Sequence, residues 1–286
     1  MGVAVSARYR LGLPAWAFPG WRGTCFDANA DPLREYSRVF STVEGNTTFY
    51  GIPSAAKVNA WREAVSGRDF TFCFKLPQTV TDRRRPDQQD LEALLHRIAP
   101  LEEHLGPLLV QFPPTVGFAE LPAVRSICDA LPRSWPLFLE LRHPQLFDDF
   151  ERWRPFREAL RASRVIMDAN PLHAGNPLHP EVVGALHEKA ALPVHDWDAT
   201  EGEQSPLLLR LVLHPDDGGT DAAIEAWAQR IAAHLKRGRA CYITLHCPNN
   251  QHCPDHARRF HRALGQHVSL PELEAFRTAV QPGLFD

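Results

Sequence analysis

The sequence lacks any apolar run long enough to cross a membrane, and its N-terminus lacks the apolar core of a signal peptide. We therefore expect a cytoplasmic protein that does not contact the bilayer. An excess of basic residues is also missing, since the formal net charge is −3 at pH 7. This balance excludes a general electrostatic affinity for nucleic acid but still allows a local positive cleft.

Two familiar motifs are absent as well. No G-x-G-x-x-G follows the first apolar segment, so no nucleotide cofactor is expected. The six cysteines are scattered and lack the C-x₂-C spacing of common zinc sites. In a cytoplasmic chain they should be reduced thiols, with Cys73 and Cys241 acting as small core residues.

Short apolar segments, by contrast, recur along the whole chain. With 286 residues, 44% of them hydrophobic, the chain is large enough for a full core. Helical patterns lie between most of the segments, for example after Ser54, which is placed to cap a helix. The alternation predicts an α/β fold, a single-domain (β/α)₈ TIM-type barrel over residues 1–272, with a doubly wound open sheet as the alternative. The predicted strands are 11–16, 40–46, 70–76, 107–112, 137–142, 164–168, 207–213 and 240–246.

The strand predicted at 137–142 ends in charged side chains. Glu140 and Arg142 share one face of it, and His143 follows. Burying charge costs several kcal/mol unless it is paired, so these residues indicate a site. A single polar strand end usually just reaches water, but seven strands here end in polar residues, which a barrel would bring to one mouth.

The residues expected at this mouth combine carboxylates with cations. Lysine and arginine in a concave site suit phosphate or carboxylate groups, and carboxylates among cations stay ionised and serve as bases or orienting groups. The alternative is a mutually neutralised network that only binds, and whether the protein is an enzyme stays open. The candidate catalytic residues are Glu44, Glu140, His143 and Asp168, with either His143 or His246 as proton shuttle. The candidate substrate-binding residues are Asn46, Tyr50, Lys75, Gln111, Arg142, Arg210 and His246.

A metal is conceivable at two places but is not favoured. Residues 246–256 are rich in histidine and cysteine, although their spacing is not typical of zinc sites. Glu44, Glu140 and Asp168 could hold Mg²⁺ or Mn²⁺, but the neighbouring cations would compete for their oxygens.

Four stretches together resemble a known family. They are residues 43–53 (VEGNTTFYGIP), 72–77 (FCFKLP), 106–114 (GPLLVQFPP) and 139–144 (LELRHP). In order and spacing they resemble the YecE-like family, domain of unknown function 72, over residues 11 to 262. The resemblance implies a TIM-type barrel, similar at the level of fold to endonuclease IV and sugar isomerases, and implies no established activity.

The chain departs from the family pattern in its last quarter. The family's seventh strand usually reads Arg-Leu-His-Gly, whereas residues 210–213 read Arg-Leu-Val-Leu. The eighth strand usually ends in asparagines, whereas here residues 246–250 read His-Cys-Pro-Asn-Asn.

The tail over residues 273–286 offers a separate clue. Gln281, Leu284 and Phe285 resemble the peptide by which bacterial DNA-processing proteins dock on the replication sliding clamp, although short motifs also arise by chance. Three hypotheses follow. The first is a hydrolase acting on a phosphate-containing, nucleic acid-related substrate. The second is a sugar or sugar-phosphate isomerase using Trp16, Trp21 and Tyr50 as stacking surfaces, and the third is a non-catalytic DNA-associated module.

Overall fold

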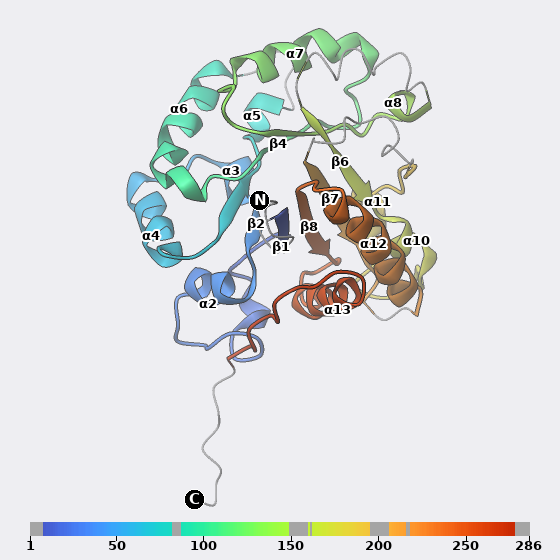
Figure 1. Ribbon diagram of the computed structural model, residues 1–286. Coiled ribbons are helices and arrows are strands. Elements are labelled where there is room, and N and C mark those ends of the chain that lie inside the picture. The colour runs from blue at the N-terminus through green and yellow to red at the C-terminus, as the bar shows by residue number, and fades with distance from the viewer. Residues whose placement is uncertain are drawn as a thin grey trace, which may run out of the picture.

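Eight parallel strands form the centre of the molecule in the computed structural model (Figure 1). The structure describes residues 8–81, 87–148, 160, 162–194, 206–215 and 218–277. The strands are β1 (Tyr9–Gly12), β2 (Thr42–Gly45), β3 (Thr71–Phe74), β4 (Leu108–Gln111), β5 (Leu137–Glu140), β6 (Ser163–Asp168), β7 (Leu207–Val212) and β8 (Cys241–His246). Seven of the eight strands lie close to the predicted ranges, and β1 overlaps its predicted range only at residues 11 and 12.

The strands belong to two parallel sheets. Six of them form a half-barrel sheet in the order β1-β8-β7-β6-β5-β4, and β2 pairs with β3. Backbone hydrogen bonds also cross both gaps between the sheets. Ser41 N donates to Leu11 O at 3.1 Å beside β1 and β2, and Gly106 N donates to Phe72 O at 2.9 Å beside β3 and β4.

The six-stranded sheet is strongly curved. Leu109, Phe138, Val165 and Leu208, from four successive strands, meet in one buried cluster, and Tyr242 of β8 packs against it. Side chains from five strands can share one cluster only if the sheet bends around them. We call this concave face the inner side.

Helices surround the strands on the outside (Figure 1). Their apolar faces, such as Ile224, Trp227 and Ile231, are buried against the sheets. The longer helices are α2 (Pro32–Val39), α4 (Ala55–Val65), α6 (Gln88–Ile98), α7 (Leu121–Ala130), α12 (Gly218–Lys236) and α13 (Cys253–Gly265). Short ones are α3 (Thr47–Tyr50), α5 (Gln78–Thr81), α8 (Gln145–Asp148), α10 (Asn170–Ala174), α11 (Ala185–Glu188) and the 3₁₀ turns η1 (Pro19–Trp21), η2 (Ala99–His104) and η3 (Phe118–Glu120).

Among the described helices, side chains cap the start of α2, α4 and α6. The Ser54 hydroxyl accepts a hydrogen bond from Lys57 N at 3.2 Å and caps α4 as predicted. The prediction for the first strand was wrong at its bounds, because β1 ends at Gly12 rather than 16. Pro14 has no N–H to continue the ladder, and Leu13 N donates to the Tyr36 hydroxyl at 2.8 Å instead.

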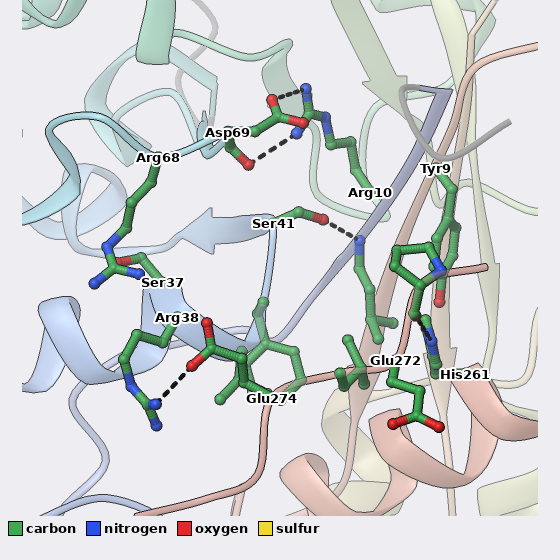
Figure 2. A pocket seen from close by; sticks show the side chains of 15 residues that line it. Tyr9, Arg10, Ser37, Arg38, Ser41, Arg68, Asp69, His261, Glu272 and Glu274 are labelled. Carbon is green, nitrogen blue, oxygen red and sulfur yellow. Dashed lines mark hydrogen bonds and ion pairs between the residues drawn. The ribbon is translucent and has the colours of Figure 1, made fainter. Parts of the chain in front are cut away.

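The described helices include none with the length and apolar character needed to span a bilayer. A cavity of about 510 Å³ lies at the N-terminal ends of the strands, lined by Arg10, Asp69 and the segment that follows α13 (Figure 2). That segment is attached through Glu274, which pairs with Arg38 at 2.7 Å, and through Phe276, which packs on Phe26. Residues 273–277 therefore continue the domain, and residues 278–286 lie outside the described part.

Candidate functional site

A buried arginine lies at the centre of the inner side, near the carboxyl ends of the strands. Arg210 of β7 binds both oxygens of Glu44 from β2, with Nε–Oε2 and Nη2–Oε1 distances of 2.9 Å. Its Nη1 lies 2.5 Å from Oε2 of Glu140 on β5. One guanidinium thus joins strands from both sheets.

A second arginine extends the network towards solvent. Arg142, just beyond β5, donates from Nε to Oε1 of Glu140 at 2.6 Å and from Nη2 to Gln111 Oε1 at 3.1 Å. The side chain of Arg142 is 19% exposed, whereas those of Glu140 and Arg210 are at most 9% exposed. The Sδ of Met167 accepts from Arg142 Nη2 at 3.7 Å and from Arg210 Nη1 at 3.9 Å.

Glu44 is surrounded by further donors on its other side. Asn46 Nδ2 donates to Oε1 at 2.9 Å, and His246 Nε2 lies 3.1 Å from Oε2. Thr244 Oγ1 is 3.4 Å from the same oxygen. Every lone-pair direction of this carboxylate is therefore engaged within the protein.

These contacts hold both carboxylates ionised. Burial alone would raise the pKa of Glu140, but the charges of Arg210 and Arg142 outweigh it and lower that pKa to about 2. Burial opposes the ionisation of Glu44 in the same way, and Arg210 holds its pKa well below the ordinary value. Both side chains act as fixed negative charges at neutral pH.

Lys75 contacts an aromatic ring but has no ion-pair partner among the described residues. Its Nζ lies 3.6 Å above the ring of Phe49, and no hydrogen bond joins it to any residue in the described ranges. Burial lowers the pKa of Lys75 to about 8, and Arg210 adds to that effect while Glu140 and Glu44 oppose it. The ammonium group therefore titrates close to neutral pH.

His246 is buried and neutral. Burial lowers its pKa to about 4 despite the neighbouring Glu44 carboxylate. Because His246 is uncharged at neutral pH, it is mainly the positive charge of Arg210 that lowers the pKa of Glu44. The expectation that His246 shuttles protons near neutral pH does not fit this environment.

Two predicted catalytic residues lie apart from the network. Asp168 points to the outer side of β6, where its Oδ2 accepts from Trp227 Nε1 of α12 at 2.8 Å and its Oδ1 accepts from Asn170 N at 3.0 Å. Met167, the residue before it, takes the inner position. His143 is half-buried in the loop after β5, where its Nδ1 accepts from Gln145 N at 3.2 Å.

The structure adds residues that sequence reasoning missed. Phe49 and Thr244 line the network, and Lys189, after α11, lies close enough for charges in it to act on its ammonium. Burial and the charge of Arg210 lower the pKa of Lys189, against the opposing charges of Cys253, Cys247 and Glu44. Nothing in its local sequence marks Lys189, because residues 169–188, which include α10 and α11, separate it from β6.

The remaining predicted residues have mixed positions. Tyr50 projects from the end of α3 with 82% of its surface exposed, and its ring meets that of Phe49 edge-on at 5.2 Å. Trp16 and Trp21 are core residues. Gln281, Leu284 and Phe285 lie outside the described residues. No three His, Cys, Asp or Glu side chains in the described ranges are grouped so as to hold a metal ion.

Comparison with known proteins identifies the family of this chain. The family model described as "Protein of unknown function DUF72" matches residues 10–279. The chain belongs to the DUF72 family. It is 32% identical over 270 residues to the UPF0759 protein YecE of Escherichia coli K12, covering 93% of this chain and 95% of that protein, and the YecE of E. coli O157:H7 matches equally.

Solved DUF72 structures share the fold. A crystal structure of a DUF72 family protein from Enterococcus faecalis V583 aligns with a TM-score of 0.65 and 19% identity, covering 94% of this chain and 99% of that one. A second crystal structure of that protein aligns with a TM-score of 0.64 and 20% identity, covering 90% and 97%. The similarity extends over the whole DUF72 domain.

Proposed function

We propose that this DUF72 protein binds a phosphate-containing ligand at the carboxyl ends of its strands and hydrolyses a phosphoester there. The observation that carries the proposal is Lys75, whose ammonium group has no hydrogen-bond or ion-pair partner among the described residues and lies beside a paired Glu–Arg network. The network orients its cations, and Lys75 supplies a charge that a ligand would neutralise.

The charge balance of the site supports an anionic ligand. Two carboxylates, Glu44 and Glu140, accompany the cations Lys75, Arg142 and Arg210, with Lys189 nearby. His246 is neutral, so the net charge is positive near neutral pH. Arginine and lysine donors in a partly buried setting bind phosphate oxygens through charge-assisted hydrogen bonds.

In the hydrolytic step, the two carboxylates would orient the arginines, and water would attack the phosphorus while the P–O bond to the leaving group breaks. Protonated Lys75 would donate its proton to the leaving oxygen, and the proton lost by the water would pass to the phosphate product and from there back to Lys75. The arginines bind both Glu44 and Glu140 and lower the pKa of each carboxyl group, so both are weak bases for a proton from water. A lysine whose pKa is about 8 exchanges protons readily near neutral pH. Proton transfer is thus assigned to Lys75 rather than to the carboxylates expected from the sequence.

A second candidate is a sugar-phosphate isomerase, which the aromatic rim favours. Tyr50 is exposed beside Phe49, and Phe49 underlies Lys75. A sugar ring or a nucleobase stacked on Tyr50 would place an attached phosphate within reach of Lys75. The third candidate, a non-catalytic DNA-associated module that docks through Gln281, Leu284 and Phe285, stays a prediction.

Closure of the two sheets into an eight-stranded barrel belongs to the same proposal. It is supported by the hydrogen bonds across both gaps, including Glu44 N to Leu13 O at 3.0 Å and Leu76 N to Leu109 O at 3.0 Å. In a closed barrel these two amides should exchange with deuterium as slowly as those of β7. Fast exchange at either gap would indicate an open sheet.

Thermal shift with inorganic phosphate, sugar phosphates, mononucleotides and short oligonucleotides tests binding. We expect stabilisation of the parent protein and its loss in Lys75→Met. Lys57→Met is the matched control, because Lys57 also lies over an aromatic ring, that of Trp61, but on the exposed surface of α4. Equal stabilisation of Lys75→Met and the parent would contradict the site.

Hydrolysis is tested with a panel of phosphodiesters and phosphomonoesters. We expect turnover by the parent and by Lys57→Met, and none by Lys75→Met. Phosphate binding without any turnover would favour the binding module, and conversion of a sugar phosphate to its isomer would favour the second candidate.

A further inference from the structure

Two buried thiols lie in contact just beyond β8. The Sγ atoms of Cys247 and Cys253 are 3.3 Å apart, and both side chains are fully buried. They flank a short loop, residues 248–252, and Cys253 is the first residue of α13. The other cysteines of the described chain are also free thiols.

The loop between the two thiols is tightly held. Asn250 has a φ of 66°, in the left-handed region, and its carbonyl accepts a hydrogen bond from Trp21 Nε1 at 3.0 Å. Gln251 Nε2 donates to Gly20 O at 3.3 Å. These contacts keep the two ends of the loop, and so the two sulfur atoms, close together.

The surroundings of Cys247 favour its thiolate. The hydrogen bond from Cys253 lowers the pKa of Cys247 although burial opposes this, and the backbone N–H of His252 and the charge of Lys189 lower it further. Burial raises the pKa of Cys253 well above its ordinary value. The pair thus has one sulfur suited to attack and one that stays protonated.

We propose that Cys247 and Cys253 form a redox-active dithiol that a peroxide oxidises to an intramolecular disulfide. The sulfur atoms need to approach by only ~1 Å to reach the bond length of a disulfide. Residues 248–252, which join the two cysteines, are half-buried.

The oxidation proceeds in two steps that balance. The Cys247 thiolate attacks one oxygen of hydrogen peroxide, which forms an S–O bond and breaks the O–O bond, and hydroxide leaves. The Cys253 sulfur then attacks the Cys247 sulfur, the S–S bond forms, and the hydroxyl group leaves and takes up the thiol proton as water. Overall, two thiols and one peroxide give one disulfide and two water molecules.

This inference does not depend on the proposed ligand. It nevertheless bears on the candidate site, because Cys247 directly follows His246, whose ring contacts Glu44. Oxidation that moves Cys247 would displace the same stretch of backbone that positions His246. Phosphate binding by the oxidised and reduced proteins can therefore be compared as a separate measurement.

Peptide mapping after oxidation tests the proposal on the folded protein. The parent is treated with hydrogen peroxide under native conditions, its remaining thiols are alkylated, and its intact mass and peptides are measured. We expect a mass loss of two hydrogen atoms, a cross-linked pair of peptides containing Cys247 and Cys253, and full reversal by dithiothreitol.

Single substitutions identify the attacking sulfur. In Cys253→Ser, Cys247 should accumulate as a sulfenic acid trapped by dimedone, whereas Cys247→Ser should show no such adduct at Cys253. Cys128→Ser is the matched control, since it removes another buried thiol and should keep the disulfide. A cross-link that forms only in unfolded protein would overturn the proposal. Oxidation of Cys25 while Cys247 and Cys253 stay reduced would overturn it as well. Both outcomes can be measured on the parent protein.

Discussion

The inner side of the sheets has two layers that differ sharply in chemistry. Towards the N-terminal ends of the strands, Leu109, Phe138 and Leu208 form an apolar cluster. One step further along the same strands, Gln111, Glu140 and Arg210 form a charged network. Side chains two residues apart on one strand face thus have opposite solvation requirements.

The two layers show how a buried strand can contain charged side chains. The apolar layer is stabilised by burial alone, whereas the charged layer depends on specific partners. A surface pair makes the contrast clear, because Arg10 meets Asp69 at 2.6 Å near the N-terminal cavity, where the Asp69 side chain is 75% exposed (Figure 2). Water screens that pair but not the buried network.

Arg210→Met should have the largest effect on stability. It leaves Glu44 and Glu140 buried without their main partner, which typically costs about 3 to 5 kcal/mol. Arg10→Met, which breaks the screened pair, should cost at most about 1 kcal/mol. Urea unfolding of both variants measures the difference, and equal losses would show that the charged layer is solvated like the surface.

Leu208→Ala should come next, because it opens a cavity in the apolar layer. Burial of Leu208 is nearly complete, and substitutions of this kind cost about 2 to 5 kcal/mol. Its effect should be confined to stability, with the phosphate-induced thermal shift retained. Loss of phosphate binding in a folded Leu208→Ala protein would mean that the two layers are coupled.

His246 should make the parent protein less stable as the pH falls. Its pKa is lowered from 6.5 to about 4 in the folded state, so the unfolded chain binds the proton more readily. Stability should therefore decline as the pH falls from 6.5 to about 4, by about 3 kcal/mol from this residue. The free energy of unfolding across that range should decline less in His246→Gln, and equal slopes for the two proteins would contradict the prediction.

Lys75 should affect ligand binding rather than stability. Because its pKa is about 8, the fraction carrying a positive charge falls as the pH rises through that value. Phosphate affinity should fall over the same range, and Lys75→Arg should keep binding at higher pH since arginine stays charged. Calorimetric titration at a series of pH values measures this, and a profile unchanged by Lys75→Arg would assign the titration elsewhere.

Trp227→Phe should have the smallest effect. It removes the donor to Asp168 Oδ2 but leaves the bonds from Asn170. A loss of about 1 to 2 kcal/mol is expected for one unpaired buried acceptor. Phosphate binding and any turnover should be unchanged. A loss of binding or turnover in this variant would show that Asp168 takes part in the functional site.

Much of the site could be predicted from local patterns. Alternation along the strand grouped Glu44 with Asn46, and the two side chains are hydrogen-bonded in the structure. For β6 the pattern was uninformative, because Val165, Ile166 and Met167 are all apolar and both faces of the strand are buried. Asp168 was therefore assigned to the mouth although it faces α12.

The sequence by itself determined where the strands lie, which of their residues share a face, and that charge gathers at their carboxyl ends. These properties depend on neighbours within a few residues. Only the tertiary structure decided that Arg210 pairs with Glu44, 166 residues away, that Lys189 approaches the network from a loop, and that Cys247 touches Cys253. Pairing across such separations depends on how the sheets curve, and burial then sets which groups are charged.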